Sequence, residues 1–128
     1  MKIINKKYNN LEIYETDFKS AKPFPHIILD NFLDESFFKN LNVDKIKINK
    51  QKGLLFNTEI ETNKWTSKNV ELNEGISKIV NELYTTDFIN NLSKLSKIKD
   101  LFSTNVGNTA LANYHEMYES GFLGTHVD

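Results

Sequence analysis

The clearest regular pattern of apolar positions lies in the second half of the chain. Five apolar residues there fall at i, i+3, i+4, i+7 and i+8: Ile76, Ile79, Val80, Leu83 and Tyr84. This stripe is typical of an amphipathic helix and predicts one over 76–84. A second helix is predicted to begin at the Thr86-Asp87 cap, with a buried side formed by Phe88, Leu92 and Leu95. Because burial alone selects such stripes, we interpret both helices as covers for a sheet.

Two elements are predicted near the N-terminus. Residues 26–33 read His-Ile-Ile-Leu-Asp-Asn-Phe-Leu, a β-branched apolar run too short for a helix of ordinary length, so they predict a strand. Asp34 follows this run and is a good N-cap, which predicts a short helix over 35–41. One face of that helix is expected to carry Phe37, Phe38 and Leu41.

Strand-type composition returns in the middle of the chain and near its C-terminal end. Residues 54–56 and 59–65 are predicted strands, and a third strand is predicted over 109–118. A turn over 119–121 is expected to end the third strand, and an extended segment over 122–128 follows it. With both helices and strands predicted, we interpret the chain as α+β.

Composition narrows the class of protein. The chain has 128 residues, 39% of them hydrophobic, which is enough for one core, so we expect a single domain over 1–128. The formal net charge of −1 argues against a nucleic-acid binder, which usually carries a basic stripe. The absence of cysteine excludes disulfide frameworks, zinc ribbons and thiol nucleophiles. With no signal peptide and no long apolar window, we expect a cytoplasmic protein without membrane contact.

The last residues carry the candidate chemistry. His126 and Asp128 are two apart, so on a strand both side chains project from one face, with their roots about 7 Å apart. An imidazole nitrogen and a carboxylate oxygen are two of the three ligands in a 2-His-1-carboxylate iron site. The pair is therefore a candidate metal site whose remaining face stays open for substrate and oxygen. A solvated chain end is the alternative interpretation of the same two residues.

Two longer segments give this pair its context. Residues 118–128 read Tyr-Glu-Ser-Gly-Phe-Leu-Gly-Thr-His-Val-Asp, and residues 23–33 read Pro-Phe-Pro-His-Ile-Ile-Leu-Asp-Asn-Phe-Leu. Both segments resemble the Fe(II)/2-oxoglutarate-dependent dioxygenases of the prolyl 4-hydroxylase-like group. In that family a Pro-Phe-Pro-type opening leads into a first strand and helix. A Tyr-x-x-Gly turn then precedes the His-x-Asp iron ligands on the second strand of a double-stranded β-helix.

The resemblance implies roles for three residues. His126 and Asp128 would bind Fe(II), and Tyr118 would donate a hydrogen bond to the cosubstrate 2-oxoglutarate; ascorbate is a candidate additional cofactor. The implied activity is hydroxylation of a small-molecule or peptidyl substrate whose identity the residues do not reveal. The implied fold is an N-terminal strand and helices packed on the first strands of a double-stranded β-helix (jelly roll), incomplete in this chain.

The family pattern continues with a second histidine and a basic residue that binds the distal carboxylate of 2-oxoglutarate. Neither follows Asp128 here, and the chain contains no Arg. We therefore expect this chain to be the N-terminal half of an oxygenase domain and to be inactive alone. Two other interpretations stay open: a non-catalytic β-helix-type module that binds protein, and a half-barrel that another chain completes.

Simpler structural roles are expected for the remaining candidates. His115 has the opposite strand parity to Tyr118 and is expected to face away from the cavity, while His26 is expected at the surface or a sheet edge. Trp65, the only tryptophan, is expected to pack against helices, and lining a substrate groove is the alternative. The lysine-dense segment 45–52 alternates Lys with Ile, which favours an edge strand with a charged outer face and no anionic partner.

Overall fold

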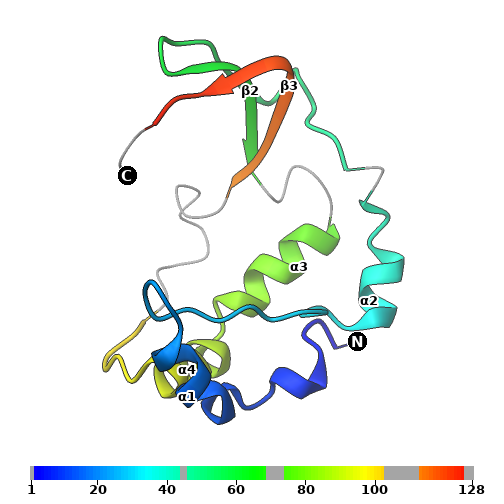
Figure 1. Cartoon of the computed structure of the whole chain (residues 1–128). Coiled ribbons are helices and arrows are strands. Elements are labelled where there is room, and N and C mark those ends of the chain that lie inside the picture. The colour runs from blue at the N-terminus through cyan, green and yellow to red at the C-terminus, as the bar shows by residue number, and fades with distance from the viewer. Residues whose placement is uncertain (1, 44–45, 69–73, 103–112, 126–128) are drawn as a thin grey trace. The chain divides into compact units, whose positions relative to one another are not determined.

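The computed structural model describes residues 2–43, 46–68, 74–102 and 113–125 and divides the chain into two compact units (Figure 1). The first unit consists of Met1–Asn42 and Lys78–Gly107, and the second of Val43–Ser77 and Asn108–Asp128. In the described residues, the first unit contains helices, and the second contains a three-stranded antiparallel sheet of order β1-β2-β3. The mixture of helix and strand confirms the α+β class, whereas the single domain expected over 1–128 stays a prediction.

The elements follow one another as η1 (Lys6–Tyr8), η2 (Leu11–Tyr14), α1 (Glu15–Ser20), α2 (Glu35–Asn40), β1 (Leu54–Phe56), β2 (Glu61–Lys68), α3 (Glu74–Leu83), α4 (Thr86–Ser96) and β3 (Asn113–Leu123), where η marks a 3-10 helix. The longest helix of the described residues, α4, has 11 residues. Within those residues, no helix combines the length and the apolar character that crossing a bilayer requires.

The core of the first unit joins the N-terminal segment to α4. Its buried residues are Ile4, Tyr8, Leu11 and Leu95, and partly buried aromatic and aliphatic side chains pack around them. The Tyr8 ring lies 5.8 Å from that of Phe32, and the Phe32 ring lies 6.0 Å from that of Phe88, measured between centroids. Residues of the N-terminal segment and of α4, far apart in the sequence, therefore share one apolar cluster.

Asn91 on α4 fixes the backbone of the N-terminal segment. Its Oδ1 accepts a hydrogen bond from the Leu11 backbone N–H at 2.7 Å, and its Nδ2 donates to the carbonyls of Tyr8 at 3.0 Å and Asn9 at 3.2 Å. These groups lie where η1 ends and η2 begins, so no regular helical hydrogen bond satisfies them. One amide side chain thus satisfies three backbone groups of a segment 80 or more residues away in sequence.

Substitution of Asn91 by Ala is expected to lower the free energy of unfolding by about 2 kcal/mol, because it leaves the Leu11 N–H next to the core without an acceptor. The measurement is urea unfolding followed by circular dichroism. Asn90→Ala is the matched control, since Asn90 is the preceding residue of the same helix and is exposed. An equal loss of stability in the two variants would contradict the role assigned to Asn91.

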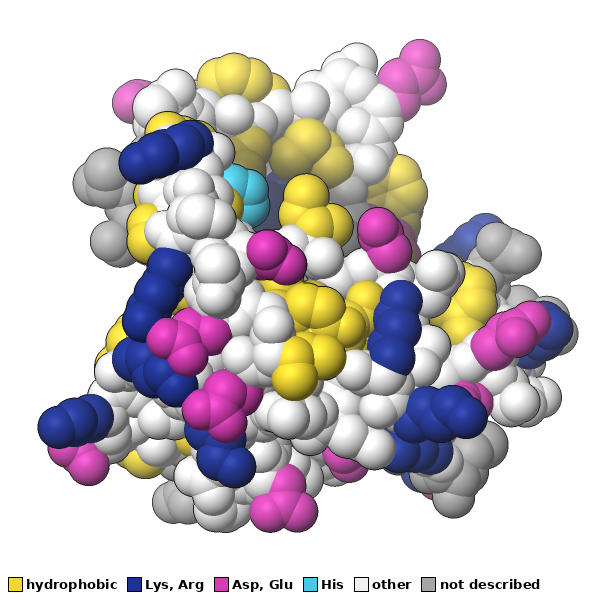
Figure 2. All heavy atoms as spheres, turned by 60° about the horizontal axis from the view of Figure 1, so that its bottom comes forward, with side chains coloured by type: hydrophobic (Ala, Val, Ile, Leu, Met, Phe, Trp, Pro, Cys, Tyr) yellow, Lys and Arg dark blue, Asp and Glu magenta, His cyan; other side chains and the backbone are white. Residues whose placement is uncertain are grey.

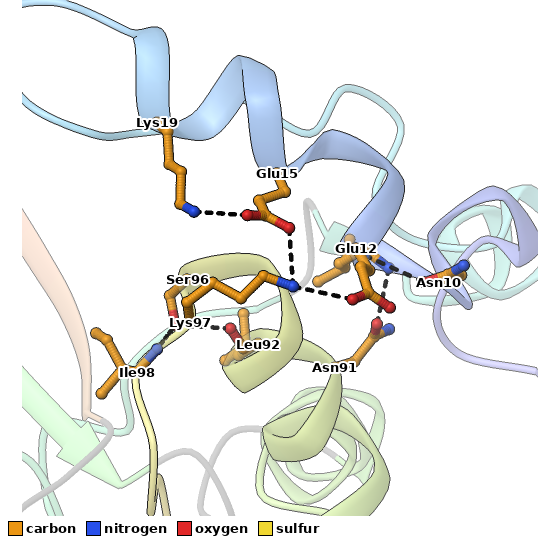
Figure 3. A network of polar contacts seen from close by, with 10 residues as sticks. Asn10, Glu12, Glu15, Lys19, Asn91, Leu92, Ser96, Lys97 and Ile98 are labelled. Carbon is orange, nitrogen blue, oxygen red and sulfur yellow. Dashed lines mark hydrogen bonds and ion pairs between the residues drawn. The ribbon is translucent and has the colours of Figure 1, made fainter.

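An ion-pair network lies beside the contact of Asn91 with the N-terminal segment (Figure 3). Lys97, in a left-handed conformation just after α4, places its Nζ 2.9 Å from Glu12 Oε1 and 2.8 Å from Glu15 Oε2. Hydrogen bonds from Lys19 and Lys97 lower the pKa of Glu15, and those to Glu15 and Glu12 raise the pKa of Lys97. The lysines and Glu12 are exposed and Glu15 is half-buried, so salt screens these ion pairs and the network orients η2 and α1 more than it stabilises them. Figure 2 likewise shows lysine and acidic side chains interspersed over the face it displays.

The prediction of a strand over 26–33 is wrong. These residues form no regular strand, and the described ladder consists of a single antiparallel bridge between Ile4 and Leu33. Pairing stops there because the partner segment turns into η1, which Asn5 caps by accepting a hydrogen bond from the Lys7 backbone N–H at 3.1 Å. Burial nevertheless alternates along this segment, since Ile27 and Leu29 pack against the core while Ile28 is 78% exposed.

The helix predictions are confirmed with small corrections. Asp34 Oδ1 caps α2 by accepting from the backbone N–H groups of Ser36 and Phe37. Phe37 and Leu41 are buried, but Phe38 is 53% exposed and does not share their face. The cap of α4 is Thr85, one residue earlier than predicted, because its extended backbone lets Oγ1 accept from the Phe88 N–H.

Candidate functional site

Tyr118 lies on β3, the strand that pairs with the central strand of the sheet. Trp65 on β2 is directly opposite Glu116 on β3, and Thr66 is opposite His115. Directly opposite residues project from the same face of a sheet, and so do residues two apart along a strand. Glu116, Tyr118 and Trp65 are therefore placed on one face, and His115 on the other, as its strand parity predicts.

The turn predicted over 119–121 is not the end of the strand. β3 continues to Leu123, and the residues after Met117 form a large bulge in which Asn63 of β2 lies opposite residues 118–121. Asn63 and Ser120 adopt positive φ angles of 50° and 64°, and Asn63 Nδ2 donates to the Glu119 carbonyl at 3.3 Å. The chain changes direction within this bulge, where the turn was predicted, and pairing of β3 with β2 resumes beyond it.

Gly121 is required by the close approach of the backbone inside this bulge. A Cβ atom at that position would lie 2.2 Å from Met117 Cγ and 2.7 Å from the Tyr118 carbonyl oxygen. Both distances are shorter than van der Waals contact, so a larger residue would push the bulge open. The glycine of the Tyr-x-x-Gly pattern therefore has a steric reason that is independent of any chemistry.

The hydroxyl of Tyr118 donates to a carboxylate. Its O–H group lies 2.7 Å from Glu116 Oε2, while Glu116 Oε1 accepts from the Ile48 backbone N–H at 2.9 Å. The hydrogen bond to Glu116 raises the pKa of Tyr118 and keeps the phenol protonated. Tyr118 is 40% exposed, so its neutral donor lies at the surface of the sheet.

The segment around Ile46 to Lys50 lies against this face but is not the predicted edge strand. No ladder pairing forms over 46–49, and 50–52 is a turn. The alternation is confirmed for the residues that the structure describes there, since Ile46 and Ile48 are buried and Lys47 is exposed. A strand does not form because the backbone N–H of Ile48 bonds to a side chain, Glu116, instead of a neighbouring strand.

Lys50 and Trp65 complete the surroundings of Tyr118. The Lys50 Nζ lies 4.6 Å from the centroid of the Tyr118 ring and 5.6 Å from that of Trp65. Trp65 thus contacts the Lys50 ammonium on its own face of the sheet. The sequence predicts packing against helices for Trp65, not a contact with a cation. Sequence reasoning missed both Glu116 and Lys50 as neighbours of Tyr118.

The two predicted metal ligands, His126 and Asp128, lie outside the described residues, and their roles stay predictions. Across the part of the chain that is described, no group of three or more His, Asp or Glu side chains is arranged to hold a metal ion. His115 has its pKa lowered by partial burial and by the nearby Lys64 ammonium. His26 Nδ1 lies 2.8 Å from the Phe24 carbonyl oxygen, so its ring has a hydrogen-bond partner within its own segment.

Comparisons of the chain with protein-family models, with curated proteins and with solved structures found no match. The case for a function therefore depends on the residues and on the geometry around Tyr118.

Proposed function

We propose that the chain belongs to an Fe(II)- and 2-oxoglutarate-dependent dioxygenase of the prolyl 4-hydroxylase-like group. In this proposal β2 and β3 are strands of a double-stranded β-helix, and the chain continues from β3 directly into the His-x-Asp pair. The observation that carries the proposal is Tyr118, the tyrosine of the Tyr-x-x-Gly pattern. It lies on an antiparallel strand, and its exposed hydroxyl donates to a carboxylate.

The hydroxyl of Tyr118 fits the recognition of 2-oxoglutarate, because it already donates to a carboxylate. The acceptor that the phenol engages, Glu116, is itself a carboxylate, which is the group that 2-oxoglutarate would present. A protonated phenol stabilises such an anion without needing a countercharge. Binding requires the Tyr118 hydroxyl to turn from Glu116 to the ligand, and Glu116 retains the Ile48 N–H as a partner after that change.

The donor set at the C-terminal end fits the metal. His126 and Asp128 supply a neutral nitrogen and a carboxylate oxygen, the ligand types that non-haem Fe(II) oxygenases use. When bound, Fe(II) and 2-oxoglutarate would activate O2, with one oxygen atom going to succinate as 2-oxoglutarate loses CO2 and the other hydroxylating a C–H bond. The protein's own contribution is to hold the two ligands at strand spacing and to orient 2-oxoglutarate through Tyr118.

The test uses the complete gene product, purified and supplied with Fe(II), oxygen and 2-oxoglutarate. Release of succinate that depends on both Fe(II) and 2-oxoglutarate is the expected result. A complete gene product that binds Fe(II) and releases no succinate with any peptidyl or small-molecule substrate would contradict the proposal and favour a non-catalytic binding module.

Tyr118→Phe is expected to raise the 2-oxoglutarate concentration at half-maximal rate by about 10- to 100-fold, because it removes one hydrogen bond to a charged ligand. Fe(II) affinity should not change, since the phenol is not a metal ligand in this proposal. Tyr114→Phe is the matched control on the same strand and face. An unchanged 2-oxoglutarate requirement in Tyr118→Phe would remove Tyr118 from the site.

A further inference from the structure

In the second unit, the ammonium group of Lys50 lies close to two aromatic rings. The Nζ of Lys50 lies 4.6 Å from the Tyr118 centroid and 5.6 Å from the Trp65 centroid, both within the range of cation–π attraction. The Tyr118 hydroxyl is in turn bonded to the Glu116 carboxylate. Two aromatic faces with an acid beside them are the chemistry that recognises alkylammonium groups.

The two rings and the acid come from neighbouring strands of the sheet. Trp65 comes from β2 and is paired directly with Glu116 on β3, and Tyr118 lies two residues further along. Lys50 enters from outside the sheet on a tight turn, in which Asn49 accepts from the backbone N–H groups of Gln51, Lys52 and Gly53. Trp65 and Glu116 therefore belong to the paired ladder and Tyr118 to the bulge next to it, whereas the cation belongs to an exposed turn.

Lys50 differs from Lys64, a lysine on β2 that also lies over an aromatic ring. The Lys64 ammonium also lies over a ring, that of Phe56, at 5.5 Å, but it forms an ion pair with Glu61. Lys50, by contrast, forms no ion pair with any residue in the described part of the chain. Its ammonium contacts the two rings, and such exposed cation–π contacts are weak enough for another cation to compete.

We propose that Trp65, Tyr118 and Glu116 form a cation-binding site that takes the alkylammonium group of an external ligand, and that Lys50 occupies this site in the free protein. The ligand class is a lysine-like or quaternary ammonium group, on a small molecule or a peptide. Tyr118 is 40% exposed, so the site opens to solvent once the flexible Lys50 side chain moves away. The site shares Tyr118 with the proposed 2-oxoglutarate site, but the titration below contains neither Fe(II) nor 2-oxoglutarate, so its outcome is separate from that of the oxygenase test.

The test uses Trp65 as its reporter, since it is the only tryptophan in the chain. Tetramethylammonium chloride is titrated into the whole 128-residue protein while the indole emission is recorded, with sodium chloride at equal concentration as the ionic-strength control. Lys50→Ala removes the internal occupant and is expected to bind tetramethylammonium saturably, at a concentration about tenfold lower than wild type. Lys50→Gln, which keeps most of the side-chain stem, should shift in the same direction.

Lys47→Ala is the matched control, because Lys47 is an exposed lysine of the same segment, and it should behave as wild type. The double variant Lys50→Ala with Tyr118→Leu should lose the response while keeping the wild-type circular dichroism spectrum. A Lys50→Ala protein with wild-type circular dichroism but no saturable emission change overturns the proposal. So does an equal response in Lys47→Ala, or a response that survives in the double variant.

Discussion

Alanine at His126 or at Asp128 is expected to lower 2-oxoglutarate-dependent succinate release from the complete gene product by at least about 100-fold. Loss of a supporting hydrogen bond around a metal ligand already costs about 10- to 100-fold in affinity or activity, and loss of the ligand itself should exceed that range. Each variant removes one of the two ligands that this chain is proposed to contribute. The measurement is succinate formation at saturating 2-oxoglutarate, together with the Fe(II) content of the purified protein.

The control for these variants is Thr125→Ala. Thr125 is exposed and directly precedes the pair, but its hydroxyl is not expected among the metal ligands. It should retain wild-type turnover and iron content. Succinate release at more than a tenth of the wild-type rate in either His126→Ala or Asp128→Ala, with iron bound, would remove that residue from the proposed site.

Leu11→Ala is expected to lower the free energy of unfolding by about 3 kcal/mol, within the range measured for buried Leu→Ala substitutions. Leu11 has no exposed surface, and its backbone N–H is held by Asn91, so the surrounding residues have little freedom to fill the cavity. Chemical denaturation gives the result: the midpoint should fall while the slope of the transition stays unchanged.

Ile13→Ala is the matched control for Leu11→Ala. Both residues are aliphatic and lie in η2, but Ile13 is 66% exposed. Its truncation should therefore change stability by less than about 0.5 kcal/mol. A Leu11→Ala protein as stable as Ile13→Ala would mean that the cluster around Tyr8 and Leu95 does not anchor the first unit.

The helices were predictable from the sequence because their signals are local. The apolar stripe of 76–84 and the Asp34 cap each lie within a few residues, and α3 and α2 form there. The strand expected over 26–33 failed because a strand needs a partner, and the pattern could not show that the facing segment turns into η1 after one bridge. The bulge after Met117 is hidden for the same reason, since it is defined by the register of β2 against β3.

The candidate site was predictable in part. The parity rule places Glu116 on the same face as Tyr118 and puts His115 on the opposite one, so the partner of the Tyr118 hydroxyl could have been found from spacing alone. Lys50 carried no such signal. It is one of 16 lysines in a chain without arginine, and the turn that brings it over Tyr118 depends on contacts distant in sequence.

The discontinuity of the first unit has a consequence for biosynthesis. Residues 4, 8 and 11 complete their core only with Leu95 and the Asn91 side chain, which are translated after the whole sheet segment β1–β2. On the ribosome, the apolar side chains of the nascent N-terminal segment therefore stay exposed until α4 has emerged. Long-range closure of this kind slows folding and leaves such a segment open to chaperones and proteases in the meantime.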